Sequence, residues 1–460
     1  MNSQSKKMEL LGSASIPKAL LAMGIPTMIG MLVNAFYNLV DAYFVGGLGE
    51  SQMGAISVVY PLGQVVVGLG LLFGNGAASY ISRLLGRGDK ENADKVASTA
   101  LYSSVSVGAV IIIISMLFLH PILKLLGATD SILPYAATYA GIYIVSCIFN
   151  VFNVTMNNIV TSEGAAKTTM CALLTGAVLN IALDPLFIYV FDLGVAGAAI
   201  ATAISQVVST SVYLTYILRK KSVFHFRMKD CTYTKEILSE IFKIGIPTLV
   251  FQILTSVSIS LINNAAGDYG DSAIAGMGVV TRLISMGSLS VFGFIKGFQP
   301  IAGYSYGAKK FDRLREAIKT SILWSTVFCV VFGLVLALFP AAIVSQFTKG
   351  DTEMIRIGAT SLRANGFSIM LFGFYTVYSS LFLALGKGRE GFILGACRQG
   401  ICFIPVILLL PAVWGLNGIL YAQPIADVLS AIITVFMAIP LHIKLNEMQK
   451  QTAAIGTNSN

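Results

Sequence analysis

Long apolar runs recur along the whole chain and are separated by short polar or Gly/Pro-marked breaks. A helix needs about 20 such residues to cross the roughly 30 Å hydrocarbon core of a bilayer. The runs are unbroken instead of alternating, which disfavours a membrane β-barrel. The pattern predicts an all-α polytopic membrane protein with twelve spans, near residues 17–45, 53–82, 96–120, 132–160, 168–191, 195–218, 236–266, 273–304, 317–346, 354–385, 392–413 and 416–441.

The predicted spans divide into two bundles of six helices. We expect an N-terminal lobe over 1–218, a cytoplasmic linker over 219–235, a C-terminal lobe over 236–445 and a flexible cytoplasmic tail over 446–460. The linker falls in the longest polar stretch, RKKSVFHFRMKDCTYTKE. We interpret this stretch as a plain connection, and contact with anionic lipid head groups is the alternative use of its basic residues.

Lysine and arginine residues are concentrated in alternate connections between the predicted spans. One set of connections contains Arg83, Arg87, Lys90, Lys95, Lys167, Arg219, Lys220, Lys221, Lys309, Lys310, Arg313 and Arg315. The other set offers little beyond Lys124, Lys349 and Arg356. Basic connections remain on the cytoplasmic side, so this asymmetry predicts a cell-membrane protein with both termini in the cytoplasm.

Composition supports a membrane protein and excludes several other classes. Hydrophobic residues make up 55% of the chain and charged residues 12%, against about 25% charged in soluble domains. The formal net charge of +9 is spread over short connections, which argues against nucleic acid as a partner. The six cysteines are scattered without a CxxC pair, so neither a disulfide framework nor a zinc site is expected.

The two halves repeat each other at an offset of 221 residues. GIPT at 24–27 aligns with GIPT at 245–248 without a gap. The same offset pairs further residues: Gly46 with Gly267, Gly49 with Gly270, Ser51 with Ser272, Gly76 with Gly297, Gly86 with Gly307, Gly194 with Gly415, and Gly197 with Gly418. Because each unit has an even number of predicted spans, the two copies face the same way about a pseudo-two-fold axis along the membrane normal. Such parallel repeats are a transporter architecture with the substrate path at the repeat interface, although symmetry alone does not establish transport.

Several segments carry a resemblance to a known family. They are GIPTMIGMLVNAFYNLVDAYFVGGLG at the start of the first half, LNIALDPLFIY in the fifth predicted span and GVAGAAIATAISQ in the sixth. Over essentially the whole chain, the sequence resembles the multidrug and toxic compound extrusion (MATE) family, in particular its bacterial and archaeal DinF-like and MepA-like branch. The resemblance implies two six-helix lobes, a central cavity, and export of cationic amphiphilic drugs in exchange for protons or sodium.

Two carboxylates inside predicted spans are the strongest candidate site. A carboxylate within a bilayer is costly, so Asp41 and Asp184 are expected to be functional. With Thr202, they lie roughly 6 to 11 Å from the predicted outer helix ends at about 1.5 Å per residue. Asn180 precedes Asp184 by four residues and therefore shares its helix face. The family resemblance implies that these four residues form an ion-binding network in the first lobe, for protons or sodium. The alternative for the two carboxylates is that they cap helix ends or lie at the interface.

The repeat confines this acidic site to the first half. The 221-residue counterparts of Asp41, Asn180 and Asp184 are Ile262, Ile401 and Pro405. Within the seventh predicted span no carboxylate lies between Glu240, near its start, and Asp268, so the second-lobe sodium site of other branches of the family is not expected here.

Aromatic, amide and basic side chains define a candidate substrate cavity, because flat organic cations can stack on aromatic rings. The candidates are Asn34, Tyr37, Phe149, Asn150, Phe152, Asn153, Asn157, Arg282 and Lys296. Helix packing is the alternative for the aromatic residues, and Arg282 and Lys296 either line the cavity or balance the acidic lobe. Some of the charged residues in or near the spans of the second half are expected to snorkel or to pair with helix ends; they are Arg282, Lys296, Arg363, Arg398 and Asp427. Pro26 interrupts the first span as either a moving hinge or a static kink.

Two short motifs suggest an enzyme but lack the required context. GYSYG at 303–307 places Ser305 at the end of an apolar helix without an evident histidine partner, and GKGREG at 386–391 joins two apolar helices without a βαβ unit. An intramembrane hydrolase is therefore the weakest function considered.

A flippase for lipid-linked intermediates is the main alternative within transport, although twelve spans and an acidic pair favour ion-coupled export. We expect no cofactor beyond the coupling ion, small organic cations as substrates, the lipid bilayer as the surrounding partner, and a monomer.

Overall fold

The computed structural model describes residues 3–348 and 351–457, and all regular secondary structure in these ranges is helical. The first half forms α1 (Ser3–Gly12), α2 (Ile16–Gly46), α3 (Glu50–Arg87), α4 (Lys90–Leu117), α5 (Leu119–Leu125), α6 (Leu133–Ser162), α7 (Ala166–Pro185), η1 (Leu186–Val190) and α8 (Gly194–Leu218). After η2 (Met228–Asp230), the second half forms α9 (Lys235–Gly267), α10 (Asp271–Gly307), α11 (Phe311–Leu338), α12 (Pro340–Ser345), α13 (Thr352–Ser368), η3 (Ile369–Leu371), α14 (Phe372–Ala384), α15 (Gly388–Ala396), η4 (Cys397–Ile401), α16 (Phe403–Trp414) and α17 (Leu416–Thr457).

The prediction of twelve membrane spans is confirmed, since twelve helical segments in the described ranges are long and apolar enough to cross a bilayer. Two of the predicted spans were too long. The third stops at Leu117 and the ninth at Leu338, and the short helices α5 and α12 follow them. Pro340 begins α12, where a proline is favoured because its missing N–H would have no helical partner. The described part of the predicted tail, 446–457, continues helix α17.

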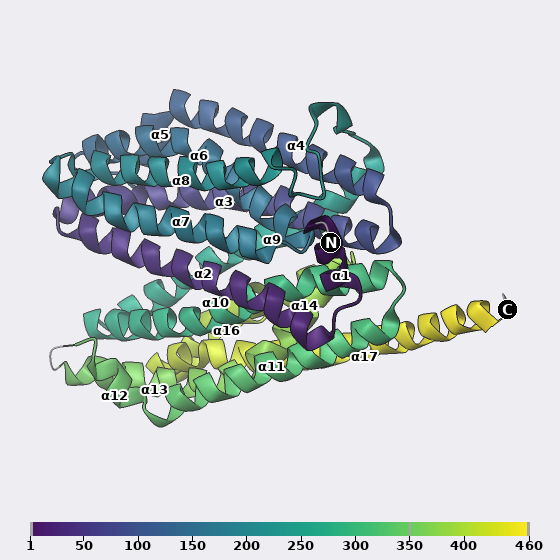
Figure 1. Cartoon of the computed structure of the whole chain (residues 1–460). Coiled ribbons are helices and arrows are strands. Elements are labelled where there is room, and N and C mark those ends of the chain that lie inside the picture. Colours follow the sequence, from purple (N-terminus) through teal and green to yellow (C-terminus); the bar gives the residue numbers. More distant parts are fainter. Residues whose placement is uncertain (1–2, 349–350, 458–460) are drawn as a thin grey trace.

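The helices form two bundles with both termini at the same end (Figure 1). Helices of the first half lie together in one bundle and α10–α17 lie together in the other, as the repeat predicts. We use the name termini face for the end of the molecule that carries α1 and the C-terminal end of α17. Two extended cores mix the halves: Leu20 of α2 packs with the second lobe, and Ile241 of α9 packs with the first.

The repeated glycines lie at the contacts between the two lobes. A Cβ atom on Gly245 of α9 would lie 2.1 Å from the Leu72 carbonyl oxygen of α3, and one on Gly76 would lie 2.2 Å from the backbone of α9. At the symmetry-related contact, a Cβ on Gly297 of α10 would lie 2.5 Å from the backbone nitrogen of Gly24. Only glycine permits such close approach of two backbones, so the glycine repeat fixes the packing of one lobe against the other.

A third glycine pair lies between α3 and α10. A Cβ on Gly86 would lie 2.2 Å from the Tyr304 carbonyl oxygen, and one on Gly307 would lie 2.1 Å from the Arg83 carbonyl oxygen. These glycines belong to the halves of their helices nearest the termini face, as do the contacts of Gly24, Gly76, Gly245 and Gly297. The lobes are therefore closely packed at the termini face.

The threonine of each GIPT segment also bonds across the lobes. Thr27 Oγ1 donates to the Gly293 carbonyl oxygen at 2.6 Å, and Thr248 Oγ1 accepts from Asn75 Nδ2 at 2.9 Å. Helix α2 continues through Pro26 beside this contact. The GIPT repeat thus supplies a glycine and a hydroxyl to each of two equivalent interfaces.

Helix α1 connects the two lobes at the termini face. Lys7 lies 3.2 Å from the fully buried Glu163 at the end of α6, and both side chains bond to the Tyr216 hydroxyl of α8. From the second lobe, Lys310 and Arg313 donate to backbone carbonyls at the end of α1 at 2.8 and 3.2 Å. Burial lowers the pKa of Lys7, and the Glu163 carboxylate opposes that shift.

Candidate functional site

The four predicted ion-site residues come from three helices of the first lobe. Asp41 lies near the end of α2, Asn180 and Asp184 lie in the last turns of α7, and Thr202 lies in the third turn of α8. Asp184 is fully buried, whereas Asp41 is partly exposed. The structure brings all four side chains together.

Asn180 bridges the other polar groups. In the amide orientation that satisfies both neighbours, its nitrogen donates to Asp184 Oδ2 at 3.3 Å and its oxygen accepts from the Thr202 backbone N–H at 3.3 Å. In the opposite orientation its nitrogen lies 3.4 Å from both Asp184 Oδ1 and Thr202 Oγ1. In either orientation Asn180 links α7 to α8 through its contact with Thr202. Asn180 and Asp184 lie one turn apart on the same face of α7, so both face this contact.

The carboxyl groups of Asp41 and Asp184 lie within hydrogen-bonding reach of each other. One oxygen of Asp41 is buried without a hydrogen-bond partner. The Tyr37 hydroxyl interacts electrostatically with both carboxyls. None of the ion pairs in the described part of the chain includes either aspartate. Two adjacent carboxylates without a basic partner repel each other, so a proton or a small cation between them would stabilise the pair.

The donor chemistry of this cluster suits a proton or a hard cation. Carboxylate, amide and hydroxyl oxygens are the ligands that hard cations prefer. No group of three or more His, Cys, Asp or Glu side chains that could hold a metal ion occurs in the described ranges. The donor set of the cluster therefore consists of carboxylate, amide and hydroxyl oxygens.

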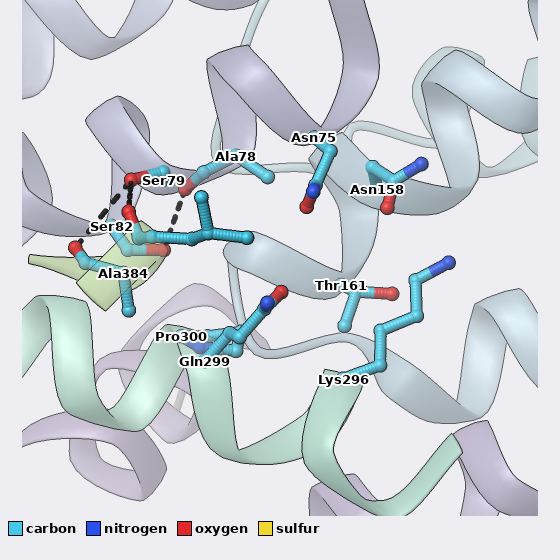
Figure 2. Close-up of a pocket in the computed structure, with 11 residues that line it drawn as sticks. Asn75, Ala78, Ser79, Ser82, Asn158, Thr161, Lys296, Gln299, Pro300 and Ala384 are labelled. Carbon is cyan, nitrogen blue, oxygen red and sulfur yellow. Dashed lines mark hydrogen bonds between the residues drawn. The ribbon is translucent and has the colours of Figure 1, made fainter. Parts of the chain in front are cut away.

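A second polar region lies between the lobes. The space not filled by atoms in this inter-lobe pocket amounts to about 330 Å³, which includes space open to solvent. Its lining comes from α3, α6, α10 and α14 and includes Asn75, Ser79, Asn158, Lys296 and Gln299 (Figure 2). Lys296 Nζ donates to Asn157 Oδ1, and Asn157 Nδ2 lies 3.4 Å from the Tyr213 hydroxyl. Of the predicted cavity residues, Lys296 thus lines this pocket and Asn157 lies directly behind it.

The remaining predicted cavity residues lie elsewhere. Phe152 packs against the first-lobe core, and Asn153 is buried between α6 and α8, where it donates to Gln206 Oε1 at 2.8 Å and accepts from Thr210 Oγ1 at 3.0 Å. These contacts are those of helix packing, the alternative considered from the sequence for aromatic residues such as Phe152 but not for Asn153. Residues outside the pocket lining also include the exposed Asn34 and Arg282, the partly buried Phe149, and Asn150, whose side-chain oxygen is buried without a partner.

Arg398 and Asp427 are not at helix ends but form a buried pair inside the second lobe. Arg398 Nε donates to Asp427 Oδ1 at 3.0 Å, and the guanidinium lies 4.5 Å from the centre of the Phe372 ring. Ser368 and Gln423 each donate to the Asp427 carboxylate at 2.9 Å. These two residues are therefore not among those that snorkel, because partners from other helices satisfy both charges within the core.

The enzyme-like motifs lack catalytic geometry. Ser305 is fully buried within α10, and its hydroxyl has no hydrogen-bond partner. GKGREG at 386–391 lies at the junction of α14 and α15. Neither motif is therefore a catalytic site.

Most residues that line the inter-lobe pocket were not predicted from the sequence. Asn75 and Gln299 are single polar residues in long apolar runs, which is the only signal that could have indicated them. Ser79 and Thr161 gave no signal, because small hydroxyl residues commonly bond to the preceding turn of their own helix, as Thr161 does to Asn157.

Comparison with known proteins agrees with this architecture. The family model described as MatE matches residues 26–186 and 247–409, two segments whose starts are separated by the 221-residue offset of the repeat. The multidrug export protein MepA of Staphylococcus aureus (strain MSSA476) is 33% identical over 429 residues, 93% of this chain and 94% of its own length. The protein of the same name from Staphylococcus saprophyticus is 32% identical over 433 residues, 94% of this chain and 95% of its own length.

Solved structures match over nearly the whole chain. An outward-facing conformation of a multidrug resistance MATE family transporter of the MOP superfamily matches with a TM-score of 0.90 and 27% identity, covering 97% of this chain and 99% of the other. A MATE structure in complex with MaL6 matches with the same TM-score, identity and coverage.

Proposed function

Because this chain belongs to the MatE family of multidrug and toxic compound extrusion transporters, we propose that it exports cationic amphiphilic compounds in exchange for protons or sodium ions. The observation that carries the proposal is the contact between the Asp41 and Asp184 carboxyls without a basic partner. A site of two acids in a low-dielectric lobe favours one bound positive charge over none. Binding and release of that charge is the coupling step.

Coupling requires that the bound ion change the relative stability of two states of the lobes. The coupling ion contacts α2 and α7, and α2 also packs against α10 of the second lobe through Gly24 and Gly297. Binding of an ion between Asp41 and Asp184 therefore acts on α2, a helix that also forms part of the interface between the lobes. An ion that binds one arrangement more tightly shifts the equilibrium by its differential affinity.

The arrangement of the lobes supports one particular state for this structure. The basic connections predict that the termini face is cytoplasmic. The lobes are packed closely at that face, so we assign the structure to a state closed toward the cytoplasm. The multidrug resistance MATE family transporter described as outward-facing has a similar overall structure. Substrate would be released from this state and captured in the opposite one.

Transport in proteoliposomes tests the proposal. A fluorescent organic cation should move only when a proton or a sodium gradient is imposed. Asp184→Asn and Asp41→Asn should each reduce coupled transport at least about ten-fold, the effect of losing roughly 1.4 kcal/mol of ion binding. Asp130→Asn, at an exposed loop position, is the matched control and should transport as the wild type does. Movement indifferent to both gradients, or full coupling in both site variants, would exclude this mechanism.

A further inference from the structure

We propose that the connection between the two lobes, residues 219–235, is a docking surface for anionic phospholipids of the leaflet at the termini face. The sequence alone favours a plain link, with contact to lipid head groups as the alternative use of its basic residues. The structure favours the alternative, because the connection has a fixed shape, lies at the lipid boundary and exposes its basic side chains. The inference concerns the membrane around the protein and does not depend on the transported substrate.

The connection is held against the side of α4. The His225 backbone N–H donates to one oxygen of the Asp94 carboxylate, and His225 Nδ1 bonds to the other, each at 2.7 Å. Phe224 and Phe226, on either side of this histidine, are buried in the first-lobe core, whereas His225 itself is exposed. Inward and outward side chains thus alternate, so the segment has a defined outer face.

Two further contacts place the connection near the edge of the hydrocarbon core. The Thr232 backbone N–H donates to Thr99 Oγ1 at 2.9 Å, and the Tyr102 hydroxyl donates to the Phe226 carbonyl oxygen at 3.2 Å. At about 1.5 Å per residue, these two positions of α4 lie about 22 to 27 Å from its far end at Leu117, against a hydrocarbon thickness of roughly 30 Å. All charged residues of α4 lie in its first two turns at the termini face. The connection therefore lies at the level of the lipid head groups and the adjoining hydrocarbon.

The connection also covers the lipid-facing side of α4. Three large apolar side chains of this helix are exposed, as expected of side chains that face lipid: Val110, Ile113 and Leu117. Thr99 precedes Val110 by 11 residues, and Tyr102 precedes Ile113 by 11. Eleven residues complete about three helical turns, so both anchors lie on the same face as the exposed residues. The connection runs beside α4 at the edge of the first bundle (Figure 1).

The outer face of the connection is basic. Six lysine and arginine side chains are exposed on it, and Asp230 is the single acidic residue of the segment. None of the ion pairs in the described part of the chain includes any of the six. They are Arg219, Lys220, Lys221, Arg227, Lys229 and Lys235. A basic cluster beside a membrane helix is attracted to the negative charge of an anionic leaflet.

Exposed apolar side chains favour a bilayer over a soluble anion as the partner. Met228 lies between Arg227 and Lys229 and is 74% exposed, and Tyr233 is 62% exposed. Apolar and amphipathic side chains beside basic ones enter the head-group region, where tyrosine is enriched. A soluble phosphate would contact only the charges and would leave the Met228 side chain in water.

Lipid photo-crosslinking from the connection tests this inference. The full chain carries Met228→benzoylphenylalanine and is placed in nanodiscs of phosphatidylcholine with about one tenth phosphatidylglycerol, and the crosslinked lipids are identified by mass spectrometry. Phosphatidylglycerol should be enriched about five-fold over its share of the membrane, the effect of roughly one basic side chain near an anionic surface. Val190→benzoylphenylalanine, at an exposed position of η1 at the opposite end of the molecule, should report the bulk lipid ratio.

Charge variants in the Met228→benzoylphenylalanine background identify the cause. Arg227→Gln together with Lys229→Gln should return the lipid ratio close to the bulk value, whereas Lys124→Gln, an exposed lysine in α5, should leave the enrichment unchanged. The inference is overturned by a bulk ratio or an absence of lipid crosslinks at Met228, or by enrichment that persists in the double variant at a wild-type thermal unfolding midpoint. Loss of the enrichment on addition of inorganic phosphate at constant ionic strength would also overturn it, in favour of a soluble-anion site.

Discussion

Arg83 of the first lobe and Glu240 of the second lie 2.6 Å apart, between Arg83 Nη2 and Glu240 Oε2. Beside them, the Tyr80 hydroxyl donates to Glu236 Oε1 at 3.1 Å. Both contacts join α3 to α9 at the termini face, where the glycine contacts bring the lobes together. The Arg83 side chain is only 8% exposed, so its bond to a charged partner should be stronger than one on an open surface.

Glu240→Gln should weaken closure of the termini face. Loss of a charged hydrogen bond typically costs about 1.5–3 kcal/mol, which would shift the closed population at least about ten-fold. Spin labels placed on the two lobes at the termini face measure this change. A loss of the closed state appears as a longer component in the distribution of distances between the labels. Glu353→Gln removes an exposed ion pair with Arg356 within a single helix and is the matched control. Distance distributions equal to the wild type in both variants would show that the Arg83 pair does not hold the lobes.

Gly245→Ala should also separate the lobes. A Cβ at this position would lie 2.1 Å from the Leu72 carbonyl oxygen, so α9 and α3 must move apart by about an ångström to reach ordinary contact. Export should fall several-fold, and the same label distances should lengthen. Gly141→Ala, in a helix with nothing within 4 Å of the added carbon, is the control and should slightly stabilise the protein. An unchanged closed distance in Gly245→Ala would mean that the helices adapt without opening.

The sequence predicted the spans, the repeat and the two candidate aspartates, because each of these appears in a local pattern or at a fixed spacing. Asp41 and Asp184 stand out because carboxylates are rare in apolar runs, and Asn180 follows from the four-residue helix period. Pairs that depend on tertiary structure could not be found in this way. Lys7 and Glu163, for example, are separated by 156 residues, and nothing in either local sequence identifies the other.

The inter-lobe pocket illustrates the same limit. Lys296 was noticed because it is a charge inside a span, but Asn75, Asn158 and Gln299 become one lining only when four helices from two lobes meet. The role of the repeated glycines was equally hidden. Their spacing revealed a duplication, whereas their contact across the pseudo-two-fold axis required the packed structure.

Thr202→Val should weaken binding of the coupling ion while it preserves side-chain shape. The change removes the hydroxyl that lies 3.4 Å from the side-chain amide of Asn180. One neutral hydrogen bond contributes about 1 kcal/mol, so the ion concentration for half-maximal transport should rise about five-fold. Thr202→Ser keeps the hydroxyl and should remain near the wild-type value. If both variants bind the ion as the wild type does, Thr202 has no part in the network.

Glu163→Gln should destabilise the protein through α1. Glu163 is fully buried, and besides Lys7 it accepts from Ser222 Oγ at 2.9 Å and the Val223 backbone N–H at 2.7 Å. Removal of one partner of a buried ion pair typically costs about 3–5 kcal/mol, because the other charge stays buried without a partner. The unfolding midpoint in detergent should therefore fall by several degrees. Glu91→Gln removes the exposed pair with Lys95 and should cost less than about 1 kcal/mol. Equal unfolding midpoints for Glu163→Gln and Glu91→Gln would contradict the stabilising role assigned to the Lys7–Glu163 pair.

Asp351 should make stability depend on pH at the face opposite the termini. Its carboxylate accepts from the Met354 and Glu353 backbone N–H groups at 3.0 Å each, and from Ser272 Oγ at 2.7 Å, which joins the start of α13 to α10. The Met354 bond, the Ser272 bond and the Glu353 bond hold the pKa of Asp351 below its ordinary value of 3.8.

The sign of the pH effect follows from this shift. Between the lowered native pKa and the ordinary value, the unfolded chain binds more protons than the folded one, so stability falls with falling pH. The contribution of the ionised group is therefore complete above pH 3.8 and is lost as the pH falls through the native pKa. Asp351→Asn keeps a capping oxygen but cannot ionise, so its unfolding midpoint should lie below that of the wild type at pH 6 and approach it toward pH 3. Asp130→Asn, which changes an exposed loop carboxyl, controls for the general effect of acid; a gap between Asp351→Asn and the wild type that stays constant over this range would contradict the prediction.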